Sequence, residues 1–448
     1  MKNNLHLPLA GILATGILAA IQTTTAALPG GGRAAKILHE FTLPPFSMAY
    51  LGFDPADLAA AEANGAVTDS PGIASGLQQL NGNRYLSVTD RGANIDRPDG
   101  FKAFPFPQFS PTIVIFKVIN DQIVPTDYLP ILNDDGENVT GLPNGPADDG
   151  PGFEDTTTPT QLPYNHDGLD PEDIHTLPGG GFILVEEYSS SVVIVSDTGH
   201  VLKRYTPEGK PLAAVEYTPG VVTPAARYSV SDSLPGVLKQ RRANRGFEGI
   251  AVSADGRTAY TVMQSPMGGT GAASPYRNSR VVRAIRMNIS DPLNMQVTGQ
   301  FVVYMSPVST YPAGNFARDM KISATSWVSE DRLLFLERSD KPGSGGAKLI
   351  LVDLSNATDV TGRPDAGVPL VYENVATDFV TLGITPATSE VILDVNAELP
   401  AITDFKLEGL SILNANTVSI SNDNDFGIGD VPGRSSKIWQ IRLGTQLR

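Results

Sequence analysis

The sequence predicts an all-β protein, a β-propeller of four-stranded blades, on three observations. Short runs rich in Val, Ile, Leu and Tyr recur along the 448 residues, and turn-forming Gly (44) and Pro (35) are frequent. An apolar hairpin pattern returns at long intervals, as propeller repeats do. Cysteine is absent, so core burial and closure of the fold, rather than disulfides, must stabilise the chain.

The first residues are typical of a secretory signal. Lys2 supplies a positive charge, Leu5–Ile21 is apolar, and Thr25–Ala27 offers small residues at a cleavage position. The apolar core is too short and too interrupted to favour a membrane anchor. We therefore expect a signal peptide at 1–27, a single domain at 28–448, and a periplasmic or secreted mature protein without membrane insertion.

The charge balance restricts the partners. The formal net charge is −15 at pH 7, which disfavours binding to nucleic acid or to an anionic membrane surface. An anionic small-molecule substrate would need bound cations, or local Arg and Lys side chains, to be accepted. The chain is expected to act as a monomer.

Five hairpins carry the repeat. Each joins two apolar strands through a tight turn that contains Gly, Asn, Asp or Pro. The hairpins are Ser75–Asp90, Glu172–Glu187, Glu248–Gln264, Ile322–Glu337 and Glu408–Asp423.

Further strands complete each predicted blade. The third strands are Thr112–Ile119, Ser191–Asp197, Arg280–Met287, Lys348–Leu354 and Lys437–Leu443. A fourth strand follows, as in His200–Thr206 and Gln300–Met305. The last blade lacks an outer strand of its own, and Ala35–Pro44 is apolar enough to pair there and close the ring. This gives five blades, with a sixth built from Val368–Val395 left open.

Acidic residues recur at two positions of the hairpin, namely the start of the first strand and the end of the second. In a propeller these positions and the long loops share one face, near the mouth of the central channel. Seven of eight aligned positions, four at each end, are carboxylates, although Asp and Glu make up only 48 of 448 residues. The eight are Ser75, Asp90, Glu172, Glu187, Glu248, Glu337, Glu408 and Asp423, and the two remaining hairpin ends, Gln264 and Ile322, are not acidic.

This set of carboxylates predicts a metal site. Converging carboxylates repel one another, and a divalent ion would relieve that repulsion. Oxygen ligands without Cys favour Ca²⁺ or Mg²⁺ over zinc. The predicted metal ligands are Asp90, Glu172, Glu187, Glu248, Glu337, Glu408 and Asp423. A structural role stays open for each, because a Glu here could instead accept backbone N–H groups of the next blade. Two further acidic stretches, His166–Asp173 and Ser421–Gly427, are also candidate ligand segments.

Basic residues adjoin the same strand ends. Arg91 follows Asp90, and Arg338 follows Glu337. Guanidinium groups suit phosphate or carboxylate oxygens, although salt bridges to the neighbouring acids are the alternative. His166 lies in a predicted loop nearby. The predicted catalytic residues are Glu248, Arg91, Arg338 and His166.

Several catalytic motifs are absent from the sequence. It contains no G-x-S-x-G nucleophile elbow, no P-loop and no H-E-x-x-H. Attack by a metal-activated water is the chemistry that the remaining residues favour.

The chain resembles the phytase-like family, also called esterase-like activity of phytase. The resemblance lies in TDRGAN (Thr89–Asn94), DGLDPEDI (Asp167–Ile174), NRGFEGIAVSADGRTAYTVMQSP (Asn244–Pro266), LLFLERSD (Leu333–Asp340) and KLEGLSILNANTVSISNDNDFG (Lys406–Gly427). It implies an extracytoplasmic propeller, and through the family's name it implies hydrolysis of phosphate esters.

Three functions follow as hypotheses. The first is a metal-dependent phosphoester hydrolase, with the metal-activated water attacking on the long-loop face. The second is a non-catalytic, calcium-stabilised propeller that binds a ligand, suggested by the aromatic loop Phe101–Phe109. The third is a carboxylic esterase or lactonase.

Overall fold

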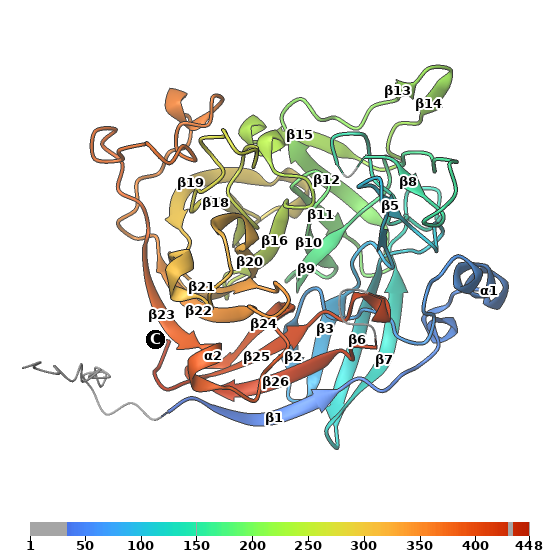
Figure 1. Cartoon of the computed structure of the whole chain (residues 1–448), viewed down its shortest axis with the longest axis horizontal. Coiled ribbons are helices and arrows are strands. Elements are labelled where there is room, and N and C mark those ends of the chain that lie inside the picture. The colour runs from blue at the N-terminus through green and yellow to red at the C-terminus, as the bar shows by residue number, and fades with distance from the viewer. Residues whose placement is uncertain (1–33, 149, 429–432, 448) are drawn as a thin grey trace, which may run out of the picture. The chain divides into compact units, whose positions relative to one another are not determined.

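The computed structural model describes residues 34–148, 150–428 and 433–447, and these are the described residues below. The predicted signal peptide at 1–27 lies outside them. The described part of the chain is mostly β-structure with few helices (Figure 1). No helix in this part is long and apolar enough to cross a membrane.

The five predicted hairpins are confirmed as antiparallel strand pairs. Their first strands are β2 (Gln78–Asn81), β9 (Pro171–Thr176), β16 (Phe247–Val252), β20 (Lys321–Ser329) and β24 (Leu407–Asn414). Their second strands are β3 (Arg84–Val88), β10 (Phe182–Glu186), β17 (Thr258–Met263), β21 (Arg332–Ser339) and β25 (Thr417–Asn422).

Each hairpin extends outward by further antiparallel strands. The third strands are β6 (Thr112–Ile119), β11 (Ser191–Val195), β18 (Val281–Asn288), β22 (Gly346–Asp353) and β26 (Lys437–Arg442). The fourth strands are β7 (Gln122–Pro130), β12 (Val201–Pro207), β19 (Gln296–Tyr304), β23 (Thr388–Asp394) and β1 (Lys36–Thr42). The segment Val368–Val395 thus adds β23 to the sheet of β20–β22.

The sheets stand around a common centre (Figure 1). The first strands of neighbouring sheets contact one another in the order β9, β16, β20, β24 and β2, and β3 contacts β9. β1, from the start of the described chain, pairs antiparallel with β26, as the sequence predicted for Ala35–Pro44. It also meets the first residue of β7 in parallel. The chain therefore folds as a β-propeller whose first and last strands share one sheet.

A few elements lie outside these sheets or extend them. β15 (Val230–Leu234) adds in parallel to β12. The remaining strands form small sheets in the loops, namely β4 (Ile95–Asp96), β5 (Lys102–Ala103), β8 (Gly152–Phe153), β13 (Val215–Thr218) and β14 (Val221–Thr223). The α-helices are α1 (Pro55–Ala63) and α2 (Val395–Glu398). These elements thus elaborate the connections and leave the radial sheets intact.

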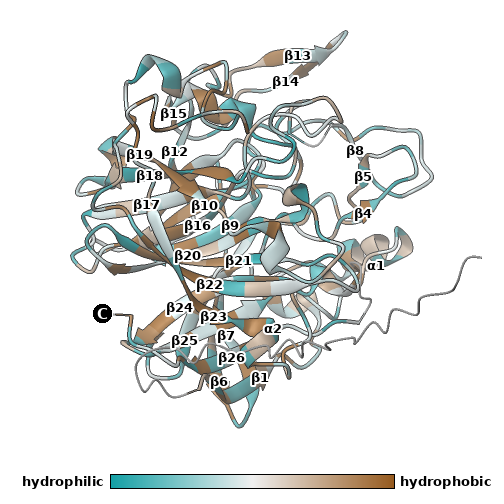
Figure 2. Ribbon diagram, turned by 60° about the vertical axis from the view of Figure 1, so that its left-hand side comes forward, coloured by the Kyte–Doolittle hydropathy of each residue, from teal (hydrophilic) through white to brown (hydrophobic). Residues whose placement is uncertain are grey.

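The hydrophobic core lies between successive sheets. One cluster joins Leu86 and Ile113 of the first sheet to Leu184 and Val193 of the next. Larger clusters fill the other interfaces. Figure 2 shows hydrophobic colour along the strands and hydrophilic colour on many loops and turns. Packing between sheets fixes the positions of the strand ends that carry the site.

Candidate functional site

A polar cavity of about 160 Å³ lies where the first strands begin. It brings together most of the acidic and basic residues that the sequence singled out. The lining residues are Asp90, Arg91, Asn94, Lys102, Asp170, Glu172, Glu187, Asn244, Glu248, Gln264, Lys321, Arg338, Lys406, Glu408, Asp423 and Asp425. Among these described residues carboxylates outnumber cations by eight to five, so the cavity carries excess negative charge.

A β-bulge at the start of three first strands explains how their glutamates reach the cavity. The pairing register shifts at Glu172 in β9, at Glu248 in β16 and at Glu408 in β24. β20 carries the same irregularity at Ser323. A bulge leaves one residue unpaired and changes the direction of its side chain. The repeated bulge therefore aims one side chain from each of these sheets at the same centre.

The second-strand positions also come together, with one difference from the prediction. Asp90, Glu187 and Asp423 line the cavity, as does Gln264. In β21, however, Arg338 pairs with Lys321 at the strand start, and Glu337 lies one residue earlier. Because neighbouring side chains in a strand point to opposite faces, Arg338 and not Glu337 enters the cavity.

Glu337 is held elsewhere. Its Oε1 accepts a hydrogen bond of 2.8 Å from the Tyr311 hydroxyl, and its Oε2 accepts one of 2.9 Å from the backbone N–H of Ser306. Burial raises the pKa of this carboxyl. Glu337 therefore does not lie with the other predicted metal ligands in the cavity, and its carboxylate is engaged by Tyr311 and Ser306 instead.

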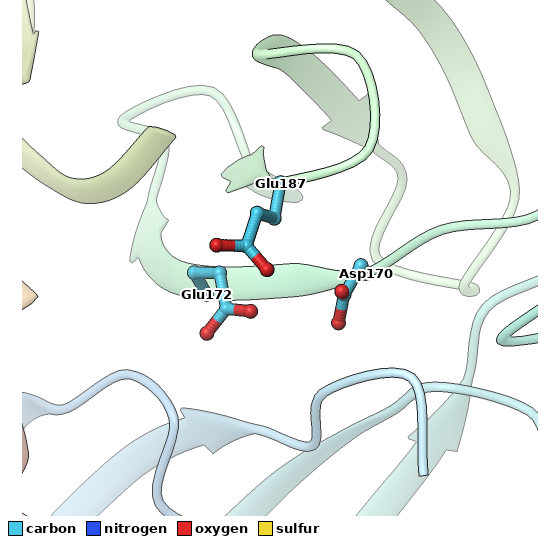
Figure 3. A group of neighbouring side chains, drawn as sticks. All are labelled: Asp170, Glu172 and Glu187. Carbon is cyan, nitrogen blue, oxygen red and sulfur yellow. The ribbon is translucent and has the colours of Figure 1, made fainter. Parts of the chain in front are cut away.

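Three carboxylates form a compact group. One oxygen from each of Asp170, Glu172 and Glu187 lies within 4.8 Å of the others, and all three residues are buried (Figure 3). Glu172 comes from the bulge of β9. Asp170 precedes that strand, and its carbonyl accepts a hydrogen bond of 2.9 Å from the N–H of Glu187. This carboxylate triad offers oxygen ligands of the kind that Ca²⁺ and Mg²⁺ take in proteins.

The electrostatics of the triad favour a bound cation. Burial raises the pKa of Glu172 well above its usual value, and the charges of Glu248, Asp170 and Glu187 raise it further. A divalent ion would remove this penalty by compensating the negative charge. The triad therefore combines the donor set of a cation site with a carboxyl group, that of Glu172, whose pKa is raised by its acidic neighbours.

Glu248 faces the same cavity with an unsatisfied oxygen. Its Oε2 is buried and has no hydrogen-bond partner among the described residues, and the same holds for Oε1 of Gln264. Burial, followed by the charges of Glu187 and Glu408, raises the pKa of Glu248 well above its usual value. Buried polar atoms are ordinarily hydrogen-bonded, so two such oxygens in one cavity point to a ligand that completes them.

Asp90 is another predicted metal ligand that lines the cavity. Its Oδ1 accepts a hydrogen bond of 2.7 Å from the backbone N–H of Gly92. Burial raises the pKa of Asp90 well above its usual value, and the charges of Asp423 and Asp170 add to the effect. Asp90 thus lines the cavity while also shaping the turn that follows β3.

The cations Arg338, Lys321 and Lys406, each paired with acids, form a second group near or in the cavity lining, and this group is called the basic side below. Arg338 forms ion pairs with Asp340 at 2.7 Å and with Glu408, and Lys406 forms ion pairs with Asp423 and Asp425. Burial raises the pKa of Glu408 to about 7, against the lowering effect of Lys406. Glu408 and Asp423, predicted as metal ligands, line the cavity but are paired with the cations Arg338 and Lys406.

Arg91 and His166 were predicted to act on the substrate. Arg91 contacts the triad, since its Nη1 lies 3.3 Å from Oδ2 of Asp170 and its backbone N–H donates to Oδ1 at 3.1 Å. It therefore orients Asp170. His166 does not line the cavity. It is buried, and its Nε2 lies 3.2 Å from the Tyr217 hydroxyl. Because the loop folds inward at this point, the predicted catalytic role of His166 has no geometric support.

The aromatic loop that suggested ligand binding is largely buried. Phe104, Phe106 and Phe109 are at most 4% exposed, and Phe101 is 37% exposed. Phe106 and Phe109 pack against Phe53, with ring centroids 5.2 Å apart in both cases. These rings form a small core beside the first sheet and leave no open aromatic docking surface.

The sequence signal missed two important residues. Asp170 lies in the acidic stretch His166–Asp173, but it precedes the hairpin repeat, so the repeat does not single it out. Lys321 lies two residues before the bulged Ser323, as Lys406 lies two residues before the bulged Glu408. Comparing the residue two positions before each bulge would have identified both.

Solved structures resemble this fold only distantly. The PQQ-bound aldose sugar dehydrogenase from Streptomyces coelicolor is 10% identical, with 92% of this chain and 99% of that chain covered and a TM-score of 0.32. The family 43 arabinoxylan arabinofuranohydrolase from Bacillus subtilis is 13% identical, with 86% and 66% covered and a TM-score of 0.40. The GH62 α-L-arabinofuranosidase catalytic domain from Coprinopsis cinerea is 8% identical, with 90% and 97% covered and a TM-score of 0.39.

No curated protein matches the chain in sequence. The family described as "Phytase-like: Esterase-like activity of phytase" matches residues 70–426. This range contains the triad, the three bulged glutamates and the basic side of the cavity, and it covers most of the sequence. The chain therefore belongs to the phytase-like family.

Proposed function

We propose that this protein is a divalent-cation-dependent hydrolase of phosphate esters. The observation that carries the proposal is one buried cavity whose lining contains both a carboxylate triad and the cations Arg338, Lys321 and Lys406. A cation on the triad and an anionic ester beside the basic residues would neutralise each other's fields. Family membership adds support at the level of a hydrolase, because the family description names esterase-like activity.

The triad is the proposed metal site. Asp170, Glu172 and Glu187 would hold Ca²⁺ or Mg²⁺ through carboxylate oxygens, with Glu248 facing the ion from the next sheet. When bound, the ion would supply Lewis-acid polarisation of a phosphoryl oxygen and favour deprotonation of water. Arg91 orients Asp170 through the contacts described above.

The basic side is the proposed anion site. Arg338 uses its two terminal nitrogens on Asp340 and Glu408, while its Nε is buried without a hydrogen-bond partner among the described residues. An ester oxygen would satisfy that N–H. Lys406 and Lys321 supply further positive charge on the same side of the cavity.

The scaffold and location are also part of the proposal. We infer a five-bladed propeller, because the strand order groups into five consecutive four-stranded units when β1 completes the last one. The mature chain, from residue 28, would act in the periplasm or outside the cell as a monomer. A small anionic ester is its proposed partner.

The decisive experiment uses mature protein stripped of metal with a chelator. Phosphate release from phytate and nitrophenyl phosphate is measured with no metal, with Ca²⁺ and with Mg²⁺. We expect activity only with a cation, and loss of that activity in Glu172→Gln. The matched control, Glu390→Gln, changes an exposed glutamate on β23 and should behave as the parent.

Parallel assays separate the alternatives. Hydrolysis of lactones or carboxylic esters without phosphate release would assign the site to an esterase. Strong thermal stabilisation by Ca²⁺ with no turnover of any ester would instead indicate a binding protein. Phosphatase activity unaffected by both chelation and Glu172→Gln would refute the proposed metal site.

A further inference from the structure

Lys321 is the cation of the cavity with the least carboxylate support. Its ammonium donates a hydrogen bond of 3.0 Å to Oδ2 of Asp340, and this is its one hydrogen-bond partner among the described residues. The same oxygen accepts from Nη1 of Arg338 at 2.7 Å. Lys321 therefore shares its only counter-ion with a second cation.

The other basic residues of this side are better compensated. Arg338 contacts Asp340 and Glu408, and Lys406 contacts Asp423 and Asp425. The pKa of Lys406 is raised well above its usual value, because the effect of these acids exceeds that of burial. Lys406 and Arg338 thus remain charged and serve as fixed positive charges.

Lys321 differs in its acidity as well as in its contacts. Burial, followed by the charges of Arg245 and Arg338, lowers its pKa to about 8, against the opposing effect of Asp340. Arg245, Arg338 and Asp340 are thus the charged groups that act on Lys321. An ammonium of this kind can give up a proton near neutral pH, which a general acid must do.

We propose that Lys321 is the general acid of the site and protonates the oxygen of the departing alcohol. This inference rests on the proposed phosphoester hydrolysis. Its geometric basis is the position of Lys321 in the cavity lining that also contains the triad, where it shares Oδ2 of Asp340 with the Arg338 guanidinium that would hold the phosphoryl group.

The step balances without a further reactant. Water oxygen forms a bond to phosphorus while the bond from phosphorus to the ester oxygen breaks. A proton moves from Nζ of Lys321 to that ester oxygen, so an alcohol leaves. The attacking water releases a proton to the solvent. The neutral amine of Lys321 then takes up a proton from the solvent.

The dependence on the leaving group tests this role. An alkyl alcohol leaves poorly as an anion and needs protonation, whereas a dinitrophenolate does not. In Lys321→Arg, positive charge beside Asp340 is retained, but arginine does not release a proton near neutral pH. We expect kcat/KM for glycerol phosphate to fall by about 10²–10⁴-fold, while kcat/KM for dinitrophenyl phosphate stays close to that of the parent.

Controls separate this role from a structural one. Calcium binding by titration calorimetry should be unchanged in Lys321→Arg, because the triad is intact. Lys203→Arg, whose Nζ donates to the Leu293 carbonyl outside the cavity, should leave both substrates unaffected. Equal losses on the two esters, or no loss on either, would refute the general-acid role. Absence of phosphatase activity in the parent would refute the proposed function instead.

A second measurement on the unaltered protein covers failure of the variant to fold. The protonated amine is the active form, so the ratio of kcat/KM for glycerol phosphate to that for dinitrophenyl phosphate should fall as pH rises through about 8. A ratio that does not change across this pH range would also overturn the inference.

Discussion

Tyr311 donates a 2.8 Å hydrogen bond to Oε1 of Glu337 and thereby keeps this carboxylate away from the central cavity. The bond distinguishes two glutamates that the sequence pattern treats alike. Glu172 enters the cavity through a bulge, whereas Glu337 is part of the packing between β21 and the loop that contains Ser306. The difference can be measured directly.

Replacing each of these glutamates by glutamine should affect a different property, namely Ca²⁺ binding for Glu172 and stability for Glu337. Glu172→Gln should weaken Ca²⁺ binding by more than about tenfold, because a charged ligand is lost. Glu337→Gln should leave Ca²⁺ affinity unchanged and lower the free energy of unfolding by about 1–3 kcal/mol, because its bonded oxygens are disturbed. Titration calorimetry and urea unfolding give the two readouts, and equal Ca²⁺ affinities for the two variants would contradict this assignment.

Without a metal, the protein should lose stability as pH rises. The pKa values of Asp90, Glu172 and Glu248 are raised in the folded chain, mainly by burial, so the folded chain binds more protons than the unfolded chain. The stability that the folded chain gains from binding these protons is fully present at a pH below 4.5, the ordinary pKa of glutamate, and is lost progressively as the pH rises above it. Ca²⁺ should therefore raise Tm more at pH 8 than at pH 5. Thermal unfolding with and without chelator tests this, and a smaller Ca²⁺ effect at the higher pH would contradict it.

Removing the guanidinium of Arg338 should strongly destabilise the protein. The side chain is 1% exposed and compensates both Asp340 and Glu408. Arg338→Met leaves these two acids without their partner, and breaking a buried pair in this way costs about 3–5 kcal/mol. Urea unfolding measures the loss. The matched change at the surface, Arg257→Met, should cost far less, and a similar cost for both would indicate that the Arg338 pairs contribute little.

Gly246, which lies outside the triad, should determine where the backbone of Glu187 can lie. A Cβ atom added at Gly246 would lie 2.1 Å from the carbonyl oxygen of Glu187 and 2.7 Å from its carbonyl carbon. Gly246→Ala must therefore displace the backbone of Glu187, and we expect weaker Ca²⁺ binding together with a loss of about 1–3 kcal/mol of stability. At Gly179 an added Cβ meets nothing within 4 Å, so Gly179→Ala is the control. Unchanged Ca²⁺ binding in Gly246→Ala would show that the triad tolerates this shift.

Alternating apolar residues and turn signals predicted the hairpins and third strands well. The segment Thr112–Ile119, for example, coincides with β6. The convergence of acidic strand ends was also predictable, because equivalent positions in repeated hairpins must meet at one mouth. β1 was identified because the last sheet needed an outer strand.

The errors arise from local geometry that the sequence does not display. The bulged residue of the fourth hairpin is Ser323, equivalent to Glu172 and Glu408, whereas the sequence alignment began that hairpin at Ile322; Arg338 therefore takes the position assigned to Glu337. Asp170 lies before its strand, outside the repeat, and joins the triad only because the preceding loop folds back. His166 belongs to the same loop but packs against Tyr217. Such loop packing depends on tertiary contacts that no local pattern records.

The pairing of β1 with β26 has a consequence for biosynthesis. β1 has its principal partner far along the chain, from Lys437 to Arg442. A nascent chain therefore holds an unmatched strand until these residues have been synthesised, and the ring of sheets can close only afterwards. A nonsense mutation that removes only β26 would leave both β1 and β25 without this partner strand. We therefore expect even this short truncation to abolish the folded structure.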